Sequence, residues 1–174
     1  PDAAFNYVPA TFVSMDDPGL VVLPTHRLIH SYADMSSKAL LSALDAHFDR
    51  QTFITLGELR DALADADPAR PSFGFYDGDY TLLTLKDLAI MDRLLPERDP
   101  NFRRLDVTVL HELILERTMG LSKESVQRKE NLTYLRDPAP GFAAVDDGEA
   151  DFLFLLNPTR IQQVRACTKA GERM

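Results

Sequence analysis

Thr25, His26 and Arg27 follow Pro24 at the end of an apolar run and bring a hydroxyl, an imidazole and a guanidinium together. A guanidinium binds carboxylates and phosphates through paired hydrogen bonds, and an imidazole can exchange a proton near neutral pH. We therefore predict that Thr25 and Arg27 bind an anion and that His26 is catalytic. A hydrogen-bonded structural role for His26 is the alternative.

A second candidate site lies at residues 157–160, where a continuous apolar run is expected to meet a helix. Free N–H groups and the helix dipole favour an anion at such a start. We predict that Asn157, Thr159 and Arg160 bind a ligand; helix capping by Asn157 and Pro158 is the alternative. We further expect His26 and Asn157 to share a cleft about 10–15 Å across, the span of a typical ligand pocket.

Other polar groups give no metal site. His111 and Glu112 would fit a zinc-protease pattern only with a second histidine four residues after the first, where this chain has Leu115. His111 is therefore interpreted as structural. The acidic residues 146–151 match no ion-binding loop and are expected to form a solvated turn. The sequence thus predicts no metal site and identifies no cofactor.

Composition limits the partners and the compartment. The 174 residues carry a formal net charge of −8, which disfavours nucleic-acid binding by this chain alone, because such binding relies on Lys and Arg. The longest apolar runs are far shorter than the roughly 20 residues of a membrane span, so no membrane association is expected. The single cysteine, Cys167, allows no internal disulfide. With no signal peptide recognised, we expect a cytoplasmic protein.

The elements that must position these residues follow from hydrophobic periodicity and turn signals. Strands are expected at residues 5–15, 20–23, 52–55, 72–76, 80–85, 132–135 and 152–156. Helices are expected after Ser36, at 56–66, at 101–119 and at 159–170, whereas 123–129 reads as a loop. The predicted fold is α+β, with a mixed, largely antiparallel sheet of about six or seven strands and three or four packed helices. Residues 1–174 are expected to form one domain.

Several segments occur in a characteristic order: MDDPGL at 15–20, LPTHR at 23–27, LTLK at 83–86, LDV at 105–107, LHELIL at 110–115, ENL at 130–132, GEAD at 148–151, LLNPT at 155–159 and GERM at 171–174. In that order they resemble the bacterial and archaeal family called domain of unknown function 1015. The resemblance implies that the chain is the C-terminal part of a longer protein, whose upstream half is then a partner. That half would carry a Gly-His-His-Arg motif. The motif resembles one in proteins of the ParB and sulfiredoxin-like fold, to which some free-serine kinases belong.

The functional expectation combines the resemblance with the polar residues. The family is uncharacterised, and the leading hypothesis is the C-terminal region of a cytoplasmic enzyme acting on a small anionic metabolite, phosphorylated or carboxylated. Thr25, His26 and Arg27 would form its site together with Asn157 and Thr159 and with the missing half. The alternative is a non-catalytic ligand-binding or protein-interaction module.

Overall fold

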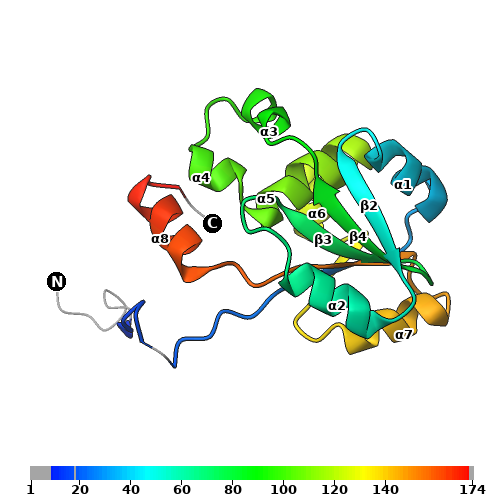
Figure 1. Ribbon diagram of the computed structural model, residues 1–174, viewed down its shortest axis with the longest axis horizontal. Helices are drawn as coiled ribbons and strands as arrows, with labels where there is room; N and C mark the ends of the chain where they lie inside the picture. The colour runs from blue at the N-terminus through cyan, green and yellow to red at the C-terminus, as the bar shows by residue number, and fades with distance from the viewer. Residues whose placement is uncertain (1–8, 18, 173–174) are drawn as a thin grey trace.

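The computed structural model describes residues 9–17 and 19–172, and its centre is a six-stranded sheet (Figure 1). The strand order is β2-β4-β3-β6-β1-β5, and all five pairings among the described residues are antiparallel. The predicted α+β class is confirmed. The strands are β1 (His26–Ile29), β2 (Phe48–Phe53), β3 (Ser72–Tyr76), β4 (Tyr80–Leu85), β5 (Leu132–Leu135) and β6 (Phe152–Leu155).

One of the described helices is a π-helix, and the others are α-helices. The α-helices are α1 (Ser37–Leu44), α2 (Leu56–Ala64), α3 (Ala89–Leu94), α4 (Pro100–Arg103), α5 (Asp106–Val109), α6 (Lys123–Arg128), α7 (Ala139–Asp146) and α8 (Ile161–Lys169). The π-helix η2 (Leu110–Thr118) continues α5 without a break. Among the described residues, no helix is both long enough and apolar enough to cross a membrane.

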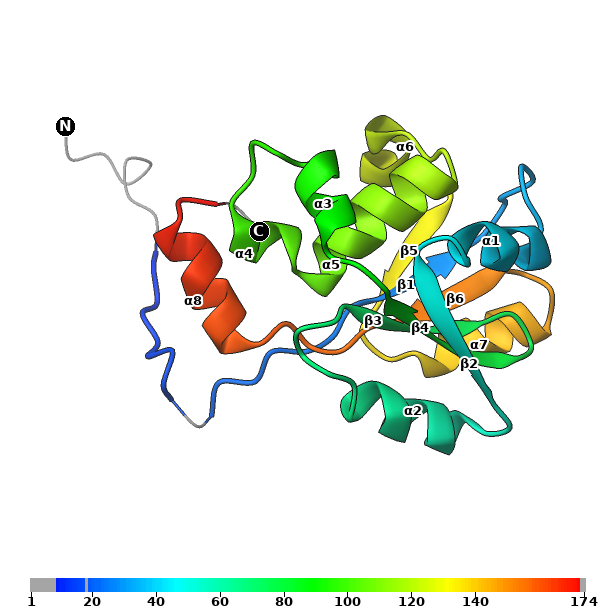
Figure 2. The same ribbon diagram turned by 45° about the horizontal axis from the view of Figure 1, so that its top comes forward.

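Helices cover both faces of the sheet (Figure 2). On the face that we call the π-helix face, residues of α1, α3, α6 and η2 belong to the larger core. On the α2–α7 face, these two helices cover a smaller core. Successive side chains of a strand point to opposite faces, and in β1 Leu28 joins the smaller core and Ile29 the larger one. His26 therefore faces α2 and α7, whereas Arg27 faces the π-helix.

Several predicted elements are confirmed. The hairpin at residues 72–76 and 80–85 matches β3 and β4, and Gly78 in its turn has a φ of 104°, which only glycine adopts readily. Ser36 caps α1 by accepting a hydrogen bond from the Ala39 N–H. The predicted strand at 132–135 matches β5.

The predicted strands at 5–15 and 20–23 are wrong where the structure describes them. Residues 9–17 and 19–25 have no helix or strand, and residues 5–8 lie outside the described part of the chain. The first strand is β1, whose partners β5 and β6 come from the last third of the chain. Residues 9–17 and 19–25 pair with no strand among the described residues, and Phe12 is 95% exposed.

The helix predictions need three corrections. The stretch at 101–119 is divided into α4, α5 and η2, and Leu105, which has an extended backbone, separates α4 from α5. The predicted loop at 123–129 is helix α6, capped by the Ser122 hydroxyl. The last helix begins at Ile161 with Arg160 as its N-cap residue, so Asn157 does not cap it.

Candidate functional site

A cavity of about 290 Å³ lies on the α2–α7 face, where β1 begins and β6 ends. Its polar side chains come from His26, Arg60, Arg136 and Asn157, and Leu63 and Leu155 are among its apolar ones. We call it the His26 cavity. Because β1 and β6 are antiparallel neighbours, the first residue of one lies beside the end of the other. The strand order thus brings His26 and Asn157 into one cavity, as expected from their places in the sequence.

His26 is fixed in place by a backbone hydrogen bond. The Leu156 N–H donates to His26 Nδ1 at 3.2 Å, and the His26 side chain is almost fully buried. Burial lowers the pKa of His26, the positive charges of Arg27 and Arg60 lower it further, and Asp137 partly opposes them. The ring is therefore neutral at pH 7. With Nδ1 accepting, its proton is on Nε2, which makes that nitrogen a hydrogen-bond donor.

Asn157 connects β6 to the end of α2. Its Nδ2 donates to the Leu63 carbonyl at 2.7 Å, so the amide holds a fixed orientation beside the cavity. Arg60 on α2 and Arg136 after β5 are exposed, and both residues line the cavity. Among the residues that the structure describes, no Asp or Glu lines it. The cavity therefore presents mainly donors and positive charge.

The predicted cluster of Thr25, His26 and Arg27 does not form a single cleft. Arg27 points to the π-helix face, because adjacent residues of a strand face opposite sides. There it lines a second cavity of about 310 Å³ together with His111 and Tyr134, which we call the Arg27 cavity. Thr25 contributes its carbonyl oxygen, which accepts a hydrogen bond from Arg27 Nη1. Thr159 is half-buried and lines neither cavity.

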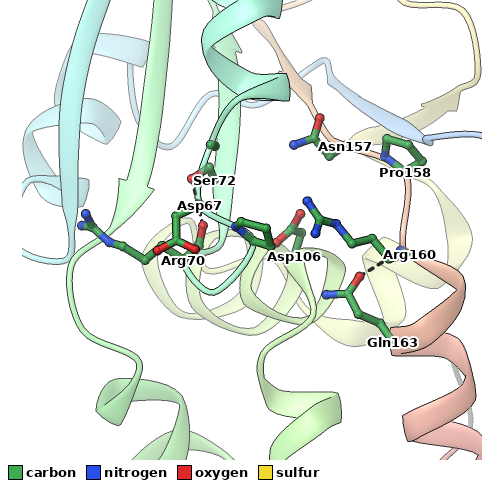
Figure 3. Close-up of a pocket in the computed structure, with 10 residues that line it drawn as sticks. Asp67, Arg70, Ser72, Asp106, Asn157, Pro158, Arg160 and Gln163 are labelled. Carbon is green, nitrogen blue, oxygen red and sulfur yellow. Dashed lines mark hydrogen bonds between the residues drawn. The ribbon is translucent and has the colours of Figure 1, made fainter.

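Arg160 lies in a third, much smaller space beside the His26 cavity (Figure 3). This space measures about 20 Å³, enough for one water molecule. The Arg160 side chain extends toward Asp106, and the Arg160 N–H donates to Gln163 Oε1 at 2.9 Å. Burial raises the pKa of Asp106 to about 6, and the Arg160 charge opposes that rise. The helix start therefore offers too little room for a metabolite.

Sequence reasoning missed Arg60, Arg136 and Tyr134, and interpreted His111 as structural only. Arg136 directly follows the expected strand at 132–135, just as Asn157 follows the strand at 152–156, and this parallel is a usable signal. Arg60 resembles any charged residue on an exposed helix surface. Its place at the cavity depends on how α2 packs on the sheet, which hydrophobic periodicity alone does not specify.

Comparison with known proteins identifies a family. The family model described as protein of unknown function (DUF1015) matches residues 1–108. The match includes β1 and therefore both His26 and Arg27, and it ends within α5. No curated protein and no solved structure matches the chain.

Proposed function

The chain belongs to the DUF1015 family of proteins of unknown function, and we propose that it binds a small anionic metabolite, with a carboxylate or phosphate group, in the His26 cavity. The observation that carries the proposal is the set of donors, His26 Nε2, Arg60 and Arg136, around a cavity whose described lining contains no acidic residue. Hydrogen bonds between charged donors and anions are the strongest in proteins.

The local charge contrasts with the charge of the whole chain. A net charge of −8 repels anions at long range, so an anion needs a local concentration of positive groups. Arg60 and Arg136 supply two such groups at the rim, and both are close enough to solvent to accept a diffusing ligand. The volume of about 290 Å³ is at the lower end of ligand pockets, which favours a small molecule.

His26 contributes to this site as a donor. A general base must present an unprotonated nitrogen to the substrate, whereas here the unprotonated Nδ1 is held by the Leu156 N–H. The nitrogen left for a ligand is Nε2–H. The geometry therefore supports ligand binding by His26 in place of the catalytic proton exchange that the sequence suggested.

Isothermal titration calorimetry with inorganic phosphate, acetate, succinate and glycerol 3-phosphate tests the proposal. At least one anion should bind, and Arg136→Gln should weaken it tenfold or more, since a hydrogen bond to a charged group contributes about 1.5–3 kcal/mol. His26→Asn should also weaken binding. Arg50→Gln on the distant strand β2 is the control and should bind like the wild type. Equal affinities for all four proteins, or no binding of any anion, would contradict the proposal.

A second candidate function, protein interaction, is favoured by the segment before β1. Phe12, Val13, Val21 and Leu23 are 95, 57, 71 and 58% exposed, and apolar surface of this kind is typical of protein contacts. We propose that the upstream half of the parent protein covers it. Hydrogen exchange on this chain and on a longer family protein distinguishes the cases: protection of residues 12–23 only in the longer protein supports the contact, and equal exchange contradicts it.

A further inference from the structure

Arg27 is a buried cation without an acidic partner. Its side chain is 6% exposed, and none of the ion pairs among the described residues includes it. Burial lowers the pKa of Arg27, and the opposing contribution comes from Tyr134. A guanidinium remains charged at any physiological pH, and a buried charge is costly unless it is paired.

The groups around Arg27 satisfy only part of its hydrogen-bonding capacity. Nη1 donates to the Thr25 carbonyl, and Nη2 lies 3.4 Å from His111 Nε2. The guanidinium carbon is 4.9 Å from the centre of the Tyr134 ring. Nε is buried and has no hydrogen-bond partner among the described residues. The fork of donors that could hold a carboxylate is thus left partly unused.

His111 is held in a neutral form that suits this arrangement. Burial lowers the pKa of His111 to about 4, with a further contribution from the Arg27 charge. At neutral pH its Nε2 can therefore accept from Arg27 Nη2. The ring stacks against Tyr134 with centroids 6.4 Å apart and planes 17° from parallel. His111 thus orients the guanidinium without neutralising it.

The Arg27 cavity continues into an apolar space. Phe102, Leu105 and Val107 form the apolar wall of its volume of about 310 Å³. Glu112 also lines the cavity, and its carboxylate is 3.5 Å from Lys123 Nζ, which lies at the same distance from Glu116. Arg27 is the cationic residue of the described lining. A molecule that fits both parts has one anionic group and an apolar body.

The helix that supplies His111 and Glu112 is the π-helix η2. In its first turn Leu110, Leu113 and Ile114 are fully buried in the core, whereas His111 and Glu112 belong to the cavity lining. Wide π-turns occur frequently at functional sites in other proteins. The backbone geometry is therefore a second feature that points to the same place.

We propose that the Arg27 cavity is a second binding site, which takes a small monocarboxylate with an apolar body, its carboxylate on Arg27 and its body against Phe102, Leu105 and Val107. The site lies on the opposite face of the sheet from the His26 cavity and is independent of the anion site proposed there. Either site can exist without the other.

The test uses 3-phenylpropionate as the probe and the whole chain as the protein. Titration should follow the ¹H–¹⁵N resonance of Arg27 Nε, which should shift as Nε gains an acceptor, and calorimetry should give the affinity. 3-Phenylpropan-1-ol, with the same body and no charge, should bind at least tenfold more weakly.

Two variants separate binding from folding. Arg27→Met should fold, because it removes an unpaired buried charge, and should lose at least tenfold in affinity for 3-phenylpropionate. Val107→Phe keeps the charge and fills the apolar space, and it should lose binding as well. Arg50→Met is the control and should bind like the wild type. Unchanged affinity in Arg27→Met, equal binding of the alcohol, or no binding of 3-phenylpropionate to the wild type would each overturn the proposal.

Discussion

The two cavities have nearly equal volumes, about 290 and 310 Å³, and opposite arrangements of charge. In the His26 cavity the arginines are exposed at the rim and the buried polar group is a neutral histidine. In the Arg27 cavity the arginine itself is buried, and its polar neighbours His111 and Tyr134 are uncharged. Water screens exposed charges, so they have a small desolvation free energy and interact weakly with other charges. A buried charge has a large desolvation free energy and interacts strongly.

The difference arises from two consecutive residues of one strand. His26 and Arg27 belong to one sequence motif, yet the sheet separates their side chains completely. A motif on a strand therefore describes two sites when both faces of the sheet are covered. The two faces also differ in their cores, because the π-helix face buries many more apolar side chains than the α2–α7 face.

The largest predicted effect tests that difference between the cores. Leu82 and Leu83 are neighbours on β4, but Leu83 is fully buried in the larger core and Leu82 lies in the smaller one. Leu83→Ala should reduce the free energy of unfolding by about 4–5 kcal/mol and Leu82→Ala by about 2–3 kcal/mol, because the cavity left in the larger core cannot collapse as easily. Urea denaturation measures both. Equal losses in the free energy of unfolding would contradict the expected difference between the two cores.

A smaller effect should appear in the dependence of stability on pH. The pKa of His111 beside Arg27 is about 4, below its ordinary 6.5, so His111 contributes stability above pH 6.5 that is lost as the pH falls toward 4. The pKa of Asp106, in the space next to the His26 cavity, is about 6, above its ordinary 3.8. Asp106 therefore contributes stability below pH 3.8 that is lost as the pH rises through 6. Each contribution is up to about 3 kcal/mol.

Single variants separate these opposing contributions. His111→Gln should stabilise the protein at pH 4 relative to the wild type, and Asp106→Asn should stabilise it at pH 8. Denaturant unfolding at pH 4, 6 and 8 gives both differences. Stability differences that do not vary with pH would show that neither group titrates as its burial implies.

The smallest effect concerns the hydrogen bond that fixes His26. His26→Ala leaves the buried Leu156 N–H without its acceptor and should reduce the free energy of unfolding by about 1–3 kcal/mol. His26→Asn places Oδ1 where Nδ1 was and should recover most of that loss, although it lacks the Nε2–H donor. Thermal unfolding of both variants is the measurement. If asparagine is as destabilising as alanine, the imidazole stabilises by packing and the hydrogen bond is unimportant.

Local signals predicted the elements that depend on local chemistry. The β3–β4 hairpin follows from Asp77-Gly78-Asp79, and α1 follows from its Ser36 cap. Strand β1 was missed because its sequence HRLI has no alternation of polar and apolar residues, and all four positions are buried by partners distant in sequence. The π-helix was also missed, since its residues are ordinary helix formers whose local preferences do not distinguish π from α.

The candidate site was predicted only in part, for the same reason. The proximity of His26 and Asn157 was predicted with His26 at the end of a strand, whereas His26 begins β1 and lies beside the end of β6 because the two strands are antiparallel. The separation of Arg27 from His26 follows from their adjacent positions on β1, and no strand was predicted at these residues. Arg60 lines the cavity because of how α2 packs on the sheet. The contact between Arg27 and His111 depends on the turn of the π-helix, which no sequence pattern predicts.

The position of β1 also affects how this protein is made on the ribosome. Ile29 pairs with Leu132 on one side and with Phe152 on the other, so β1 is synthesised long before either of its neighbours. At about 5–20 residues per second, the roughly 100 residues that separate them take on the order of 5–20 s to translate. During that time the strand that carries His26 and Arg27 emerges unpaired. Both cavities therefore need residues that are made long after β1, Tyr134 for the Arg27 cavity and Asn157 for the His26 cavity.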